Sequence, residues 1–211
     1  MRSMGYVSTR VLESLEKWSA VIFLLAGVFL LVGTVVIGLQ LLTGDPDLLK
    51  NPFELSPYLG FIISYFGLLG LYPRLADRIP LARVSLLLLL VPVIVMLIYI
   101  ATALVGTELP FGEPVSFGAF ILFALGIALF GVGSYQTEVP SRAVGLSLLA
   151  LSAGWFVLLG AGLIDGFPVW QPVAFGTAAI MTVALLAIGY LLRTGTEPTD
   201  QTEPTPDTTA R

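Results

Sequence analysis

The chain contains no cysteine and no histidine, and it has few charged residues of any kind. Disulfides, thiol nucleophiles, Cys/His zinc sites, histidine-ligated haem and imidazole acid–base pairs are therefore all excluded. Lysine occurs only as Lys17 and Lys50, both outside the apolar stretches, which argues against a Schiff-base chromophore. The sequence predicts no catalytic residue, no cofactor and no metal ligand.

Charged residues make up only 11% of the chain, hydrophobic residues make up 56%, and the mean hydropathy is +0.94. This is too little charge to cover a water-facing surface. The net charge of −4 argues against a nucleic-acid partner. The excess of arginine over lysine and the acidic loops indicate adaptation to high salt, where the screening length falls to roughly 3 Å. Ordinary compositional drift is the alternative.

Six apolar stretches lie between residues 18 and 192, and a bilayer crossing needs about 20 apolar residues. We place the stretches at residues 19–42, 57–73, 82–105, 115–135, 142–164 and 170–192. The first is too long for the apolar region of a signal peptide. Pro92 is expected to kink the third. The predicted fold is all-α, a bundle of six transmembrane helices over residues 18–192.

The segments on either side of this bundle have different compositions. In residues 1–17, apolar residues recur at helical spacing toward Trp18, which predicts an amphipathic helix on the cytoplasmic membrane surface. Residues 193–211 are rich in threonine, proline and acids, which predicts a disordered, acidic cytoplasmic tail.

Basic residues determine the expected orientation of the bundle. With six spans, all of them except Lys50 fall on one side: Arg2, Arg10, Lys17, Arg74, Arg78, Arg83, Arg142, Arg193 and Arg211. Tyrosines end the even-numbered spans on that side, as an interfacial aromatic belt would. We therefore expect a multi-pass protein of the cell membrane with both termini in the cytoplasm.

The even-numbered spans begin with similar segments. Gly60, Gly118 and Gly176 follow one another at intervals of 58 residues, and each follows a proline by a few residues. This spacing favours three tandem two-helix hairpins over chance matches. Small residues four apart also indicate close helix packing, either in a homodimer or, the preferred interpretation, within one bundle. These pairs are Ala124 with Ala128, Ala150 with Gly154, and Ala174 with Ala178.

No ionisable residue is predicted at membrane depth, and Asp165 is the nearest, just past the fifth span. This weighs against a proton-coupled transporter and against intramembrane hydrolases. Hydroxyl groups inside spans usually bond to a backbone carbonyl or a neighbouring helix, and a narrow polar path is the alternative. The residues concerned are Ser64, Tyr65, Tyr99, Thr102, Ser147, Ser152, Thr177 and Thr182.

The most distinctive loop carries a cluster of basic residues. Arg74 and Arg78 are four apart, and Arg83 and Arg142 are expected on the same side of the membrane. These four residues are candidates for contact with anionic lipid headgroups or with a protein partner. The alternative, which we prefer, is that they only determine topology.

The segment Gly67–Arg78, together with the first span from Trp18, resembles small multi-pass membrane proteins of halophilic archaea. The resemblance covers roughly residues 18–85. It implies a family without an assigned activity, so it carries no functional residue over to this chain. It agrees with the acidic, lysine-poor composition.

The leading hypothesis is a non-catalytic membrane protein acting as an accessory, scaffold or envelope component. Its expected partners are the lipid bilayer and a second copy or another membrane protein. The second hypothesis is a transporter or channel subunit for a small apolar or weakly polar solute, with a central cavity lined by Tyr99, Thr102 and Ser152. An enzyme is third, because it would need outer-loop acids to converge on a metal. Those acids are Asp45, Asp47, Glu108, Glu113 and Asp165.

Overall fold

The computed structural model describes residues 3–45, 47–49, 56–76, 81–106, 113–162 and 167–195. Within these ranges the chain forms helices and no strands. The helices are α1 (Ser3–Thr43), α3 (Ser56–Ala76), α4 (Ala82–Val105), α5 (Glu113–Thr137), α6 (Arg142–Gly162) and α7 (Phe167–Thr194). The predicted all-α fold is confirmed, and the described part of each predicted span lies on one helix.

The first and third helices are continuous over their predicted spans. The chain from Ser3 to Thr43 is one continuous helix, so the predicted boundary at residue 17 falls within α1. The location of its first turns on the membrane surface stays a prediction, and the tail beyond residue 195 lies outside the described residues. Helix α4 continues through Pro92 to Val105 without interruption.

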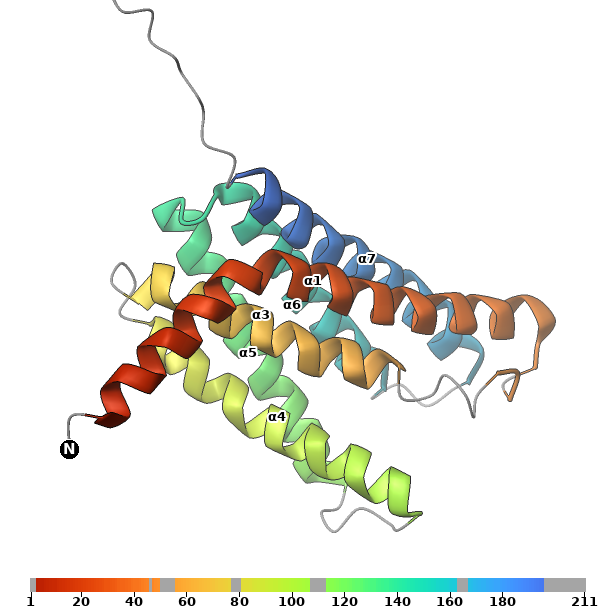
Figure 1. Ribbon diagram of the computed structural model, residues 1–211. Helices are drawn as coiled ribbons and strands as arrows, with labels where there is room; N and C mark the ends of the chain where they lie inside the picture. The colour runs from red at the N-terminus through yellow and green to blue at the C-terminus, as the bar shows by residue number, and fades with distance from the viewer. Residues whose placement is uncertain are drawn as a thin grey trace, which may run out of the picture.

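The six helices form a closed ring in chain order. Each helix packs against the next, and α7 packs against α1, while α3 and α4 touch least. Figure 1 shows α7 running alongside α1 and α4 diverging from α3. Because neighbours in the ring run in opposite directions, the start of α1 and the end of α7 lie at the same end of the bundle. We call this the basic end, since it carries Lys17, Arg74, Arg83, Arg142 and Arg193.

The interior of the ring is filled with apolar side chains. The largest fully buried ones include Phe23, Phe123, Phe130, Leu148 and Met181, which come from four different helices. On the outside, a stripe of exposed apolar residues follows one face of α1 at spacings of three and four: Trp18, Val21, Leu25, Val28, Leu31, Val35, Leu39 and Leu42. A helix with an apolar stripe facing outward as well as a packed inner face is typical of a lipid environment.

Five of the six helices are long and apolar enough to cross a membrane, by length and composition. The exception is α4, where the apolar segment that is fully described, Ala82–Ile98, is shorter than a full span. These helices are consistent with a multi-pass membrane protein.

Glycines allow several helix pairs in the ring to approach closely. A Cβ atom on Gly70 of α3 would collide with the backbone oxygen of Leu15 on α1. A Cβ atom on Gly145 of α6 would lie 2.5 Å from the backbone nitrogen of Tyr135 on α5. On the seam between α1 and α7, a Cβ atom on Gly189 would lie 2.9 Å from the Ala20 oxygen. These contacts follow the small-residue packing that membrane helices use.

Four of the six small residues paired in the sequence are buried in the bundle, whereas Ala128 and Ala150 are partly exposed. Ala124 is fully buried, and a Cβ atom on Gly154 would meet the side chain of Met181. Ala174 and Ala178 are nearly buried. These residues therefore serve contacts within one chain.

The three glycines of the sequence repeat differ in their surroundings. A Cβ atom on Gly60 would lie 3.0 Å from the Ala26 oxygen, whereas no atom of the described residues lies within 4 Å of one on Gly118 or Gly176. Close packing at the repeated position is therefore specific to the α1–α3 pair.

Candidate functional site

A cavity of about 560 Å³ opens at the end of the bundle opposite the basic end. It lies among the last turns of α1 and α6 and the first turns of α3 and α7, with one residue from α5. Its lining consists of Leu30, Gly33, Thr34, Ile37, Gln40, Asp47, Pro57, Tyr58, Phe61, Phe120, Trp155, Leu158, Leu159, Gln171, Ala174, Ala178 and Met181. The volume is in the range that small ligands occupy in proteins.

The polar groups of this cavity lie mainly near its mouth. Gln40 is in the last turn of α1 and donates through Nε2 to the Leu48 backbone oxygen at 3.0 Å. Asp47 follows α1 and is exposed, and Gln171 is in the second turn of α7. The mouth is therefore polar, while the deeper wall is almost entirely apolar.

One polar contact lies deeper and joins the first and last helices. The hydroxyl oxygens of Thr34 on α1 and Thr182 on α7 are 3.0 Å apart. Thr34 donates its own hydroxyl hydrogen to the Leu30 oxygen at 2.9 Å, so Thr182 is the donor to Thr34. Both residues are buried.

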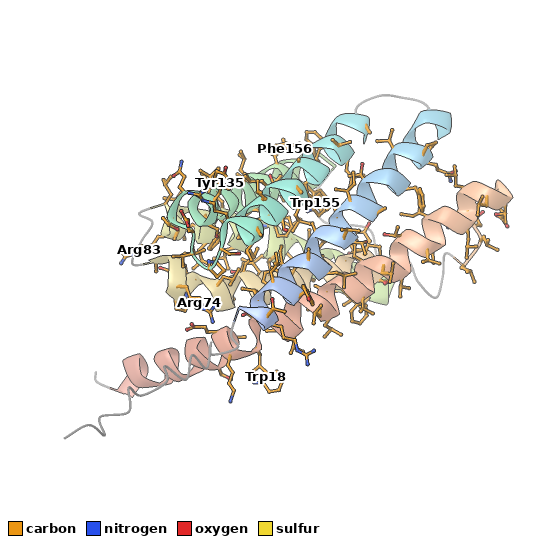
Figure 2. All side chains as sticks on the ribbon, turned by 90° about the horizontal axis from the view of Figure 1, so that it is seen from above. Trp18, Arg74, Arg83, Tyr135, Trp155 and Phe156 are labelled. Atoms are coloured by element: carbon orange, nitrogen blue, oxygen red, sulfur yellow. The ribbon has the colours of Figure 1, made fainter. Side chains whose placement is uncertain are left out.

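An aromatic cluster closes the inner end of the cavity. The Trp155 ring centroid lies 4.4 Å from that of Phe61 and 5.1 Å from that of Phe120, which is nearly parallel to it. Phe123 meets the indole edge-on at 5.5 Å. Figure 2 shows Trp155 directed toward the bundle and its neighbour Phe156 directed outward. The buried apolar core continues from this cluster toward the basic end. The cavity is therefore blind, which means that it opens at one end only.

The Trp155 indole nitrogen is buried and has no hydrogen-bond partner among the described residues. A buried N–H without a partner costs about 1–3 kcal/mol. Because the aromatic neighbours surround the indole, we attribute its position to packing. Its hydrogen-bonding capacity is not met by the described part of the chain.

Most of the described span hydroxyls with assigned partners bond to backbone carbonyls. Ser152 donates to the Ala124 oxygen on α5 at 2.8 Å, and Ser64 donates to Phe61 within its own helix at 2.7 Å. Ser147 donates to Ala143 at 3.0 Å. The expected cavity lined by Tyr99, Thr102 and Ser152 is not the one found: Thr102 and Ser152 do not line it, and the Tyr99 side chain lies outside the described residues.

The four arginines proposed for headgroup contact have different surroundings. Nε of Arg74 donates to Oε1 of Glu16 at 2.8 Å, and an Nη group of Arg142 donates to Oε1 of Glu138 at 2.6 Å. Arg83 is exposed, and Figure 2 shows it at the same end of the bundle as Arg74. Arg78 lies outside the described residues.

A second cavity, of about 650 Å³, lies at the basic end between α1, α3 and α7. It brings Arg74 together with Lys17 and Arg193. We did not predict this grouping, because the sequence does not reveal that α1 and α7 are neighbours. The only available signal was that Lys17 and Arg193 begin and end the predicted bundle on the same side.

In the described part of the chain, no three aspartates or glutamates come together as metal ligands would. Of the outer-loop acids, Asp45 and Asp47 are described, and Oδ1 of Asp45 accepts a hydrogen bond from the Asp47 backbone at 3.0 Å. The side chains of Glu108, Glu113 and Asp165 lie outside the described residues.

Comparison with known proteins found no matching protein-family model, curated protein or solved structure.

Proposed function

We propose that this chain is a six-span integral membrane protein of the cell membrane with a non-catalytic role, as an accessory, scaffold or envelope component. The observation that carries this proposal is the closed interior of the ring. Phe61, Phe123 and Trp155 meet at its centre, and the apolar core continues from them toward the basic end. Among the described residues, this apolar packing favours a structural role over a polar route across the bundle.

The packing of α4 supports a sixth span. Its Ser85 hydroxyl donates to the Gly126 oxygen on α5 at 2.5 Å, and Leu89 fills the space beside the same glycine. The opposite side of the helix exposes Leu87, Leu90, Ile94 and Leu97, as a lipid-facing surface would. With six spans both termini lie on one side, and the basic residues make this side the cytoplasm.

We also propose three tandem hairpins, on the basis of the 58-residue spacing of Gly60, Gly118 and Gly176. The pairs α1–α3, α4–α5 and α6–α7 pack directly together, as the hairpins require, and the other consecutive pairs do so too. We further propose a high-salt origin, supported by the acidic, lysine-poor composition. It predicts a higher unfolding temperature in molar KCl than in dilute buffer.

A second candidate is a carrier for a small apolar or weakly polar solute. The blind cavity of about 560 Å³ favours it, because a carrier needs a binding site open to one side. Transport would then require Phe61 and Trp155 to move and open a path toward the basic end.

Cysteine labelling distinguishes the two candidates, since any introduced thiol is the only one in the protein. We would treat membranes carrying Ala178→Cys or Ser152→Cys with a water-soluble thiol reagent. Ala178 lines the cavity, whereas Ser152 is buried against α5. Exposed Thr43 provides a positive control as Thr43→Cys.

Labelling of Ala178→Cys and protection of Ser152→Cys is the result expected for the non-catalytic role. Labelling of Ser152→Cys at a rate near that of Thr43→Cys would show a water-filled path and would favour the carrier. In intact cells, Arg142→Cys at the basic end should react only after permeabilisation. Reaction before permeabilisation would overturn the proposed orientation.

A further inference from the structure

The cavity at the basic end combines positive charge with a position at the end of the membrane spans. Three basic side chains, from Lys17, Arg74 and Arg193, line it together with one carboxylate, from Glu16. Ser19 adds a hydroxyl, which donates to the Glu16 backbone oxygen at 2.8 Å. The cavity is therefore net basic, and three different helices contribute to it.

Glu16 also fixes the geometry of this cavity. Its Oε1 accepts from Nε of Arg74 at 2.8 Å, and both side chains are about two-thirds buried. The pair engages only Nε, and the Nη groups of a guanidinium carry further N–H donors suited to phosphate oxygens. The ion pair therefore holds the Arg74 guanidinium in a fixed place beside Lys17.

The surface that continues from the cavity is apolar. Val21 lines the cavity and is half exposed, and Leu25 and Val28 continue the same face of α1 at spacings of four and three. Trp18 is 55% exposed beside Lys17, and Figure 2 shows it directed away from the bundle. A tryptophan at this level is typical of the membrane–water interface. A free phosphate would use only the basic part of this surface.

We infer that this cavity holds the phosphate headgroup of an anionic membrane lipid, whose acyl chains lie along the exposed face of α1 from Val21 to Val28. Lys17, Arg74 and Arg193 supply the charge, as in other basic pockets between membrane helices. The inference rests on the proposed location of the basic end at a membrane surface. It assigns a binding site that the non-catalytic role does not require.

The test uses the full-length protein in bilayers of phosphatidylcholine with phosphatidylglycerol. In a Trp155→Phe/Trp170→Phe background, Trp18 is the only tryptophan and reports the lipid beside it. Brominated phosphatidylglycerol should quench Trp18 more strongly than brominated phosphatidylcholine at equal mole fraction. Added salt should reduce the difference by screening.

The decisive variant is Lys17→Gln/Arg193→Gln, which leaves the Glu16–Arg74 pair in place. A basic residue at an anionic surface contributes roughly fivefold to association, so loss of two should reduce the preference for phosphatidylglycerol by roughly 25-fold. The matched control is Arg83→Gln/Arg142→Gln, which removes the same charge from the same end but away from the cavity. The control should keep its preference, and Lys17→Arg/Arg193→Lys should restore it.

Three results would overturn the inference. Equal quenching by the two brominated lipids would show no selectivity for the anionic headgroup. An equal loss in the Arg83/Arg142 control would show only general surface charge. Relief of quenching by millimolar inorganic phosphate at constant ionic strength would identify a soluble phosphate as the ligand. If the tryptophan background fails to fold, the same two charge variants can be made in the protein with all three tryptophans. The phosphatidylglycerol that each variant retains after purification in detergent is then counted and compared.

Discussion

Close contacts between helices should make the effect of a single methyl group depend on where it is added. Alanine is favoured over glycine within a helix by about 1 kcal/mol. At Gly70 the added methyl would meet the Leu15 backbone oxygen of α1, and a backbone atom cannot rotate away. Overpacking of this kind costs about 1–3 kcal/mol. For such a severe collision we expect the upper part of that range, and a net destabilisation by Gly70→Ala of about 1–2 kcal/mol.

The repeated glycines provide matched controls for this substitution. Around Gly118 and Gly176 no atom of the described part of the chain lies within 4 Å of an added Cβ, so alanine there should be neutral or stabilise by up to about 1 kcal/mol. Gly60, with the Ala26 oxygen at 3.0 Å from the added Cβ, should give an intermediate result. The order of stability is therefore Gly176→Ala and Gly118→Ala highest, Gly60→Ala next, and Gly70→Ala lowest.

The assay is unfolding by a denaturing detergent in mixed micelles, followed by loss of helical circular dichroism. A Gly70→Ala variant as stable as the parent would refute the close α1–α3 approach. Destabilisation by Gly118→Ala or Gly176→Ala equal to that of Gly60→Ala would show that the repeated glycines pack alike. That result would contradict the structure and strengthen the tandem-repeat hypothesis.

The remaining predictions concern polar contacts. Ser85→Ala removes the hydrogen bond to the Gly126 oxygen and should destabilise the protein by about 0.6 kcal/mol in the same unfolding assay. Ser147→Ala removes a hydrogen bond within one helix and should cost less. Equal costs would contradict an interhelical role for Ser85. Thr182→Val removes the donor to Thr34 and should destabilise more than the same change at Thr194, which bonds within its own helix. A double-mutant cycle for Glu16 and Arg74 should give about 0.5 kcal/mol at low salt, declining at high salt. The exposed Glu138–Arg142 pair should give less, and a coupling that does not change with salt would contradict both assignments.

The helices could be predicted from the sequence because the chain consists of long apolar runs separated by loops that contain proline and glycine. Apolar runs of this length have few alternative structures in a membrane. The predicted third span, 82–105, coincides with α4. Apart from the start of α1, which lies 16 residues before the predicted start of the first span, the predicted and described ends of the other spans differ by only a few residues. Gly44 and Gly106, with positive φ, follow α1 and α4.

The two cavities could not be read from the sequence, because both depend on which helices are neighbours. Trp155 and Phe61 are 94 positions apart in the chain and meet only because α3 and α6 both face the centre of the ring. Similarly, Lys17 and Arg193 lie at opposite ends of the bundle's sequence. The hydroxyl pattern was equally ambiguous, since Ser152 reaches another helix and Ser64 only its own. Spacing along one helix does not separate these cases.

The seam between α1 and α7 has a consequence for the order in which the protein assembles during synthesis. Five of the six helix pairs in the ring join consecutive helices, so each of these can pack once the later helix has left the ribosome. Only the seam, with Gly27 against Leu186, Gly189 against Ala20, and Thr182 bonded to Thr34, must await the end of translation. In a nascent chain released before residue 182, the ring would stay open between α1 and α7. The face of α1 that packs against α7 would then be uncovered.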